Sequence, residues 1–285
     1  MTDMHERVPA QRPGLLGDTS ARDYSDKLSK FNAFAQPELQ GLIRGLNLEP
    51  GMQVLDAGCG TGEVSNWILD EVAPAGRVVG IDLSAAHVAV ARRQAAPGLQ
   101  LHQANLLDDL FEPASFELVW CVNTINHLTD PVAGVVHLAT LLREGGRVAL
   151  GQSAFLADMY FAWDARLERA VNDAVRRYYQ DRYDLDEHDL AAVRALVGTL
   201  RQASLQNITV RTVVIERMSP LDAASAAYLG EAVFRGTWGE RLRPYLSAAD
   251  YGELSRLCDP DSPNYVLRRP DFHYLQSFTL ATGEI

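Results

Sequence analysis

Between positions 53 and 152, short stretches rich in apolar residues alternate with longer segments of helical spacing. The short stretches predict strands at residues 53–57, 77–82, 99–103, 116–122 and 146–152. The segments between them predict amphipathic helices at about 63–72, 85–95 and 131–142. Strands that alternate with helices in this way are typical of parallel βαβ units. The pattern therefore predicts an α/β fold with a doubly wound, mostly parallel sheet.

Segments of helical spacing also flank this alternating core, which we place at residues 49–153. Within residues 1–48, the sequence predicts a flexible arm up to about residue 18. From residue 23 onward it predicts helices, which Pro37 interrupts. The remaining chain predicts an aromatic-rich helical segment (154–188), a helix and strand (189–218), a second helical segment (219–262) and a closing strand (263–285). Insertions after the fifth and sixth strands would lie above the carboxyl ends of the strands, where open α/β sheets bind ligands. We therefore expect the N-terminal helices and both insertions to form a lid.

Composition narrows the class of protein. The 285 residues are 47% hydrophobic and 22% charged, which fits one large globular domain or one domain with an insertion. No apolar run approaches the roughly 20 residues of a membrane span, and residues 1–13 lack the apolar core of a signal peptide. Three scattered cysteines, Cys59, Cys121 and Cys258, suit a reducing cytoplasm. The net charge of −11 disfavours nucleic acid, so we expect a cytoplasmic protein that binds a small molecule. The oligomeric state stays open, a homodimer included.

The turn after the first strand contains three alternating glycines, Gly58, Gly60 and Gly62. A backbone without Cβ atoms can turn sharply and approach a ligand closely. Asp56 comes just before the turn, where its carboxylate can reach the ligand edge of the sheet. The Gly-x-Gly-x-Gly spacing differs from the Gly-x-Gly-x-x-Gly of dinucleotide sites. The pattern predicts a ligand site, with an ordinary tight turn as the alternative.

Asp82 ends the second predicted strand, 20 residues after Gly62. A carboxylate at this position can accept two charge-assisted hydrogen bonds from a ribose diol. The alternative role, a cap for the next helix, can be filled by Ser84 alone. The next polar stretch, residues 103–108, contains Asn105 and Asp108, and the fourth strand leads into Asn123 and the pair Asn126-His127.

These stretches together resemble the motifs of class I S-adenosylmethionine (SAM)-dependent methyltransferases of the small-molecule type, including those related to ubiquinone/menaquinone C-methyltransferases. The resemblance spans about residues 50–150. It implies a seven-stranded sheet whose last strand is antiparallel, and SAM as the cofactor, with S-adenosylhomocysteine (SAH) as product. It assigns cofactor binding to Asp56, Gly58, Cys59, Gly60, Gly62, Asp82, Leu83, Asn105, Leu106 and Asn123. Asn105 departs from the family, where Asp usually accepts from the adenine amino group; Asp108 is the alternative.

His127 and Tyr24 are the candidate catalytic residues. His127 follows the fourth strand, close to the place where the resemblance puts methyl transfer, and a neutral imidazole can accept a proton or orient an acceptor. Tyr24 begins a helical pattern that fits a covering helix, because an N-terminal Tyr folds over the cofactor in many such enzymes. The alternatives are a capping or packing role for His127 and a core position for Tyr24. His87, His102 and His137 favour structural roles, and no metal site is evident.

Lid aromatics suggest an apolar, planar methyl acceptor that stacks; they are Tyr160, Phe161, Trp163, Tyr178, Tyr179 and Trp238. Alternatively, several of them form the core of the lid itself. We expect a small aromatic acceptor methylated at carbon, nitrogen or oxygen. Residues 24–40 are also loosely similar to natural-product methyltransferases that act on indole carbon. Two other hypotheses are a non-catalytic methyltransferase-like protein that binds SAM or a partner, and an NAD-dependent oxidoreductase, which the glycine spacing disfavours.

Overall fold

The computed structural model describes residues 21, 23–154, 159–161, 163–185 and 192–285. The predicted N-terminal arm at 1–18 lies outside this part of the chain. Within it, the strands are β1 (Gln53–Ala57), β2 (Arg77–Asp82), β3 (Leu99–Gln103), β4 (Phe116–Val122), β5 (Leu142–Ser153), β6 (Tyr160–Phe161), β7 (Gln206–Met218) and β8 (His273–Glu284). They form a single sheet in the order β3-β2-β1-β4-β5-β8-β6, and β7 pairs with β8.

The sheet is parallel except for β8. Strands β1 to β5 pair in parallel, whereas β8 is antiparallel to each of its neighbours β5, β6 and β7. The predicted α/β class and antiparallel last strand are therefore confirmed. The strand number differs from the implied seven, because Tyr160 and Phe161 pair with Leu275 and Tyr274 of β8. This two-residue strand lies in a segment that the sequence predicts to be helical.

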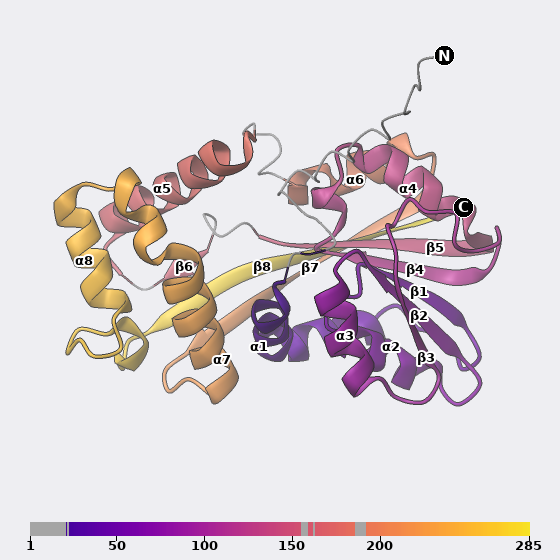
Figure 1. Ribbon diagram of the computed structural model, residues 1–285, viewed down its shortest axis with the longest axis horizontal. Helices are drawn as coiled ribbons and strands as arrows, with labels where there is room; N and C mark the ends of the chain where they lie inside the picture. The colour runs from indigo at the N-terminus through magenta and orange to yellow at the C-terminus, as the bar shows by residue number, and fades with distance from the viewer. Residues whose placement is uncertain (1–20, 22, 155–158, 162, 186–191) are drawn as a thin grey trace, which may run out of the picture.

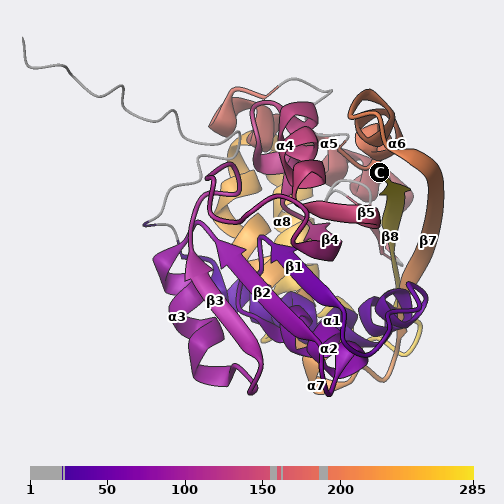
Figure 2. The ribbon, with the colours of Figure 1, turned by 90° about the vertical axis from the view of Figure 1, so that its right-hand side faces the viewer.

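Helices cover both faces of the sheet. They are α1 (Ser25–Arg44), α2 (Glu63–Val72), α3 (Ala85–Gln94), α4 (Pro131–Thr140), α5 (Ala165–Tyr183), α6 (Ala192–Gln202), α7 (Ala223–Ala227) and α8 (Ala248–Cys258), with shorter turns η1 (Ile125–His127), η5 (Gly239–Tyr245) and η6 (Val266–Arg268) and the π-helix η4 (Tyr228–Trp238). In Figures 1 and 2, α1, α2 and α3 lie on one face and α4 and α6 on the other. This is the doubly wound arrangement that the alternating pattern predicts.

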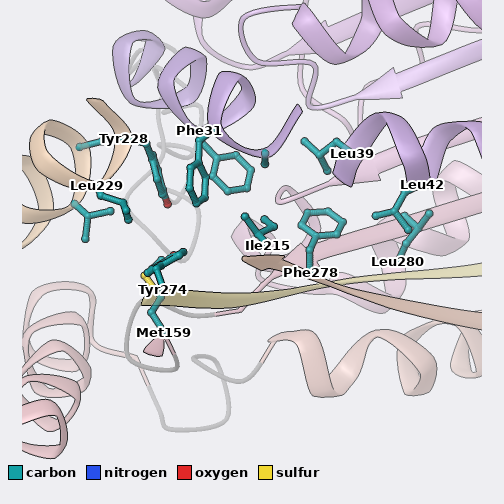
Figure 3. Close-up of a cluster of buried hydrophobic side chains, with 14 of the residues drawn as sticks. Phe31, Leu39, Leu42, Met159, Ile215, Tyr228, Leu229, Tyr274, Phe278 and Leu280 are labelled. Carbon is teal, nitrogen blue, oxygen red and sulfur yellow. The ribbon is translucent and has the colours of Figure 1, made fainter. Parts of the chain in front are cut away.

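The N-terminal helix α1 joins the core to the lid. Phe31, Leu39 and Leu42 are buried on its inner face and point toward side chains of β7, β8 and η4 (Figure 3). Burying a Leu or Phe side chain stabilises the fold by roughly 1.5–3 kcal/mol, so this stripe fixes the helix firmly. Pro37 does not interrupt α1, contrary to the prediction, and the helix continues through it to Arg44.

The lid consists of β6, α5, η4, η5, α7 and α8, which lie to the left of the sheet in Figure 1. Its interior is aromatic. Phe161 stacks on Trp163 with ring centroids 4.6 Å apart, and Phe234 stacks on Trp238 at 5.4 Å. Phe161 and Trp238 are buried, whereas Tyr160 is 45% exposed. From the sequence we expect six aromatic residues to bind the acceptor. Three of them, Phe161, Trp163 and Trp238, instead form the core of the lid, and Tyr160 lies on its surface.

Every helix in the described ranges is too short or too polar to cross a membrane.

Candidate active site

The glycine turn lies between β1 and α2 and has left-handed backbone angles, with φ of +91° at Gly58 and +86° at Gly62. The amides of Gly58 and Cys59 both donate to the carbonyl of Ile81 in β2, at 2.8 and 2.9 Å. A Cβ at Gly58 would stand 2.1 Å from Thr124 Oγ1. The turn thus requires glycine for its backbone conformation and for the close approach of the β4 exit.

Asp56, the acid that precedes this turn, is buried beneath α2. Its Oδ2 accepts a 2.5 Å hydrogen bond from Ser65 Oγ. The pKa of Asp56 is raised to about 7, chiefly by burial and to a smaller extent by the nearby Asp82 carboxylate, while the Ser65 hydroxyl opposes this rise. Asp56 is 2% exposed, and its contact with a cofactor stays a prediction.

Asp82 lies at the tip of β2 and already holds three donors. Its Oδ2 accepts from the Gly60 amide at 2.9 Å, and its Oδ1 accepts from the Ser84 amide at 2.8 Å. The third donor is the Nδ1 atom of His87, 3.1 Å from Oδ1. The carboxylate therefore joins the glycine turn to the start of α3, next to the partly exposed Leu83. Its geometry fits the predicted diol-binding position, and the ribose contact itself stays a prediction.

The loop after β3 is held together by its own polar groups. Asn105 Oδ1 accepts from the Leu107 amide at 2.9 Å, and Asp108 Oδ2 accepts from the Asn105 amide at 2.9 Å. Leu106 is buried beneath the loop. The Asn105 oxygen that we expect to accept from adenine thus already accepts one hydrogen bond, from the Leu107 amide. An amide oxygen has two lone pairs and can accept a second one. Adenine recognition by Asn105 remains a prediction.

Asn123 connects the carboxyl ends of β4 and β5. It adopts a left-handed conformation (φ +51°), and its amide donates to the Gly151 carbonyl at 2.8 Å. Its Oδ1 accepts from the Ser153 amide at 2.9 Å and from the Ser153 hydroxyl at 3.1 Å. Asn123 is therefore rigid, and one side of it borders a cavity.

That cavity has a volume of about 700 Å³ and lies between the strand ends and the lid. Its walls come from the first turn of α1, the exits of β4 and β5, the carboxyl end of α5, η4 and η5. Tyr24, Asn123 and His127, which are far apart in the sequence, all line it. Leu28 reaches from this cavity to the glycine turn, where its Cδ1 lies 3.2 Å from the position of a Cβ on Gly60. Of the predicted cofactor residues, Asn123 lines the cavity, and Leu28 packs between the cavity and the glycine turn.

The cavity combines an aromatic wall with amide groups. The wall contains Phe31, Tyr178, Tyr179, Tyr183 and Tyr228. Of the aromatics expected from the sequence to bind the acceptor, Tyr178 and Tyr179 lie here.

Four amide side chains line the cavity: Asn123, Asn126, Gln152 and Gln276. The oxygens of two of them, Asn126 Oδ1 and Gln152 Oε1, are buried without a hydrogen-bond partner among the described residues. Leaving a buried acceptor unsatisfied costs about 1–3 kcal/mol, so these oxygens favour a ligand that carries donors.

Sequence reasoning missed two residues that organise this site. His87, expected to be merely structural, connects Asp82 to the backbone amide of Tyr24, which donates to Nε2 at 2.9 Å. Glu63, the first residue of α2, accepts from Ser29 at 2.7 Å and from Asn32 at 2.9 Å, both in α1. No sequence signal identifies His87, because its partners are a backbone amide 63 positions away and a carboxylate on another element. Glu63 directly follows the glycine turn and could have been suspected.

Comparison with known proteins agrees with this geometry. Residues 54–146 match the family model described as a methyltransferase domain. Curated relatives include a demethylmenaquinone methyltransferase of Lactococcus lactis (26% identity, covering 50% of this chain and 58% of the relative). A ubiquinone biosynthesis O-methyltransferase of Idiomarina loihiensis (36%; 34% and 41%) and the nocamycin O-methyltransferase of Saccharothrix syringae (34%; 41% and 43%) also match. The chain covers less than two thirds of the length of these relatives.

Among solved structures, the YcgJ protein of Bacillus subtilis shares the fold, with a TM-score of 0.53 and 13% identity over 87% of this chain and 98% of that one. Residues 54–146 are therefore similar to methyltransferase domains, and the chain has the α/β fold of this solved structure.

Proposed function

We propose that the protein transfers the methyl group of SAM to a small aromatic acceptor bound in the cavity beneath the lid. The observation that carries this proposal is the cavity itself: Tyr24, Asn123 and His127 line it together with an aromatic wall, and Leu28 of its lining packs against the glycine turn. SAM would supply an electrophilic methyl group on its sulfonium. The protein would supply binding, orientation and exclusion of water.

We expect the nucleoside donor to lie beside the glycine turn. Asp82 presents a carboxylate there and accepts a hydrogen bond from the Gly60 amide. Asn123 would fix the backbone against which the methionine end lies. These residues are among those that the sequence predicts to bind the cofactor.

We infer the acceptor's class from the tyrosine and amide side chains that line the cavity. Tyr178, Tyr179 and Tyr183 offer flat faces for stacking. The unpartnered oxygens of Asn126 and Gln152 call for a ligand with O–H or N–H donors, which a phenol, a hydroquinone or an aromatic amine possesses. The quinone-pathway relatives are in keeping with such an acceptor. We infer that the acceptor is a ring carrying at least one hydroxyl or amine.

His127 and Tyr24 are the side chains available for the proton that such an acceptor loses. Both line the cavity, His127 from the β4 exit and Tyr24 from the start of α1. As the acceptor atom forms its bond to the methyl carbon, the carbon–sulfur bond breaks, SAH leaves, and the acceptor's proton passes to a base. We assign that base to His127, because a neutral imidazole accepts protons near neutral pH, whereas a phenol does not.

The test is an assay of the purified protein with SAM and a panel of phenols, hydroquinones, indoles and aromatic amines. Mass spectrometry would measure the gain of one methyl group and the release of SAH. Asp82→Ala should weaken SAH binding by about 1.5–3 kcal/mol, the value of lost charged hydrogen bonds, and the exposed Asp70→Ala serves as the control. Failure of folded wild-type protein to bind SAM or SAH in calorimetry would refute the proposal. Binding without turnover of any acceptor would instead favour a non-catalytic SAM-binding protein.

A further inference from the structure

A continuous hydrogen-bonded connection runs from Asp82 through His87 to the main chain of Tyr24. His87 Nδ1 lies 3.1 Å from Asp82 Oδ1, and the backbone amide of Tyr24 donates to His87 Nε2 at 2.9 Å. His87 is 7% exposed, so both contacts are shielded from water. The imidazole thereby bridges α3 and the residue that directly precedes α1.

The direction of these hydrogen bonds follows from elementary chemistry. A backbone amide can only donate, so the His87 Nε2 that receives it carries no proton. A neutral imidazole then has its proton on Nδ1, where it donates to the Asp82 carboxylate. The two ring nitrogens therefore act differently, because Nδ1 orients the carboxylate and Nε2 holds Tyr24.

The two ends of this connection belong to different parts of the site. Asp82 faces the predicted ribose position, and Tyr24 lines the cavity for the acceptor. A carboxylate has about four acceptor positions, and three are taken by Gly60, Ser84 and His87. A diol that brings two hydroxyl donors must therefore change at least one of these contacts. Ser84 and His87 both contact Oδ1. Ser84 contacts it through its backbone amide, whereas His87 contacts it through its side chain.

We propose that His87 is a positioning residue that couples occupation of Asp82 by the cofactor to the placement of Tyr24 over the acceptor cavity. The inference rests on the proposed function, because it requires a nucleoside at Asp82. It gives a role to a side chain that touches neither reacting atom. Removal of His87 would leave both halves of the site formed but independent of each other.

Two substitutions separate the two ring nitrogens. In His87→Asn, the side-chain amide nitrogen stands as many bonds from Cβ as Nδ1 does, so it can still donate to Asp82 but cannot reach Tyr24. In His87→Gln, the terminal amide stands where Nε2 does, so its oxygen can still accept from Tyr24 while the contact with Asp82 is lost. Because both variants remove the ring, each is the other's control for packing, and thermal unfolding checks that both fold.

The experiment measures SAH affinity by calorimetry and amide hydrogen exchange in the peptide covering residues 23–28, with and without SAH. In wild type, SAH should change exchange at Tyr24. His87→Asn should bind SAH within about threefold of wild type, exchange faster at Tyr24, and lose the effect of SAH there. His87→Gln should keep slow exchange at Tyr24, lose the effect of SAH there, and bind SAH at least as tightly as wild type, because the diol no longer competes with His87 for Asp82 Oδ1.

The outcomes distinguish the inference from the function on which it rests. If wild type binds SAH but the two variants show the same SAH affinity and the same exchange at Tyr24, the positioning role is overturned and the proposed function stands. An unchanged SAH effect at Tyr24 in His87→Asn would also overturn it. If folded wild type does not bind SAH, the proposed function fails, and the coupling fails with it.

Discussion

Single residues fix the geometry of the site through backbone strain, buried charge and hydrogen bonding. Gly58 and Gly62 hold left-handed turns against neighbouring side chains, Asp56 is buried behind them, and Asp82 joins them to α3. The glycine spacing and both acids can be recognised in the sequence, because backbone freedom and charge follow from residue type. The role of His87 cannot, because it depends on a hydrogen bond across 63 positions.

The buried carboxyl of Asp56 makes stability depend on pH in an unusual direction. Its pKa is about 7 in the fold and near 4 when unfolded, so between these values the folded state binds more protons. Stability should therefore fall as pH rises from 4 to 7, and the full cost should persist above pH 7. Asp56→Asn cannot ionise and removes this loss. Its advantage over wild type should grow by roughly 3 kcal/mol between pH 5 and 8, as measured by urea unfolding. Parallel pH profiles would contradict the assignment.

Gly62 combines a strained backbone angle with a crowded neighbour. A Cβ there would lie 2.8 Å from Ala91 Cβ, whereas Gly51, with φ +100°, has nothing within 4 Å of its Cβ position. Gly51→Ala therefore measures the backbone term alone, about 1–2 kcal/mol, and Gly62→Ala should cost more because α3 must also move. Restoring space with Ala91→Gly should recover part of the excess. Equal losses in chemical denaturation for both alanine variants would show that crowding plays no part.

At the scale of elements, the sequence predicts the first four strands with their observed bounds, because each is a short stretch with two or more apolar residues between turn or helix signals. The failures have physical reasons. Strand β6 has two residues, too few for any periodicity, and forms only because β8 offers partners more than 110 positions later. Pro37 does not break α1, because tertiary packing along its buried face outweighs the lost hydrogen bond. The π-helix η4 likewise leaves no trace in the spacing of apolar residues.

Helix α1 is attached to the cofactor side of the site by Glu63. Burial would raise the pKa of Glu63, but hydrogen bonds from Thr61, Ser29 and Asn32 outweigh this effect and lower it. A lowered pKa means that the stabilisation is present above the unfolded pKa and is lost as the pH falls through the folded value. Glu63→Gln should therefore lower the free energy of unfolding by about 1–2 kcal/mol at pH 7. The difference should shrink at pH 3.5, and a constant difference would contradict it.

At the scale of the whole molecule, lid and core share structure. Strand β8 pairs with β5 along Phe278–Glu284 and with β6 at Leu275 and Tyr274, so one strand runs through both. Buried residues of α1, the sheet and the lid also form one continuous cluster. The lid is therefore part of the fold's main core.

This continuity predicts a single unfolding transition. Trp163 and Trp238 report on the lid, whereas Trp67 and Trp120 report on the methyltransferase core. We would make two variants, each keeping one pair of tryptophans and carrying Phe in place of the other pair. In each variant, the denaturant midpoint from tryptophan fluorescence should coincide with the midpoint from circular dichroism. If the fluorescence of Trp163 and Trp238 changes at a lower denaturant concentration than the circular dichroism, the lid unfolds before the core and the prediction of a single transition is wrong.

The cavity walls have a practical consequence for redesign. Residues that would contact the acceptor lie mainly on α5, η4 and η5, whereas those that would hold the nucleoside lie on the β1 turn, β2 and α3. Substitutions at Tyr178, Tyr179 and Tyr183 can therefore be used to seek new acceptors without rebuilding the donor side, and because these rings contact one another they should be varied together. A library confined to these three tyrosines is small enough to sample in full, and every member would inherit the same methyl source.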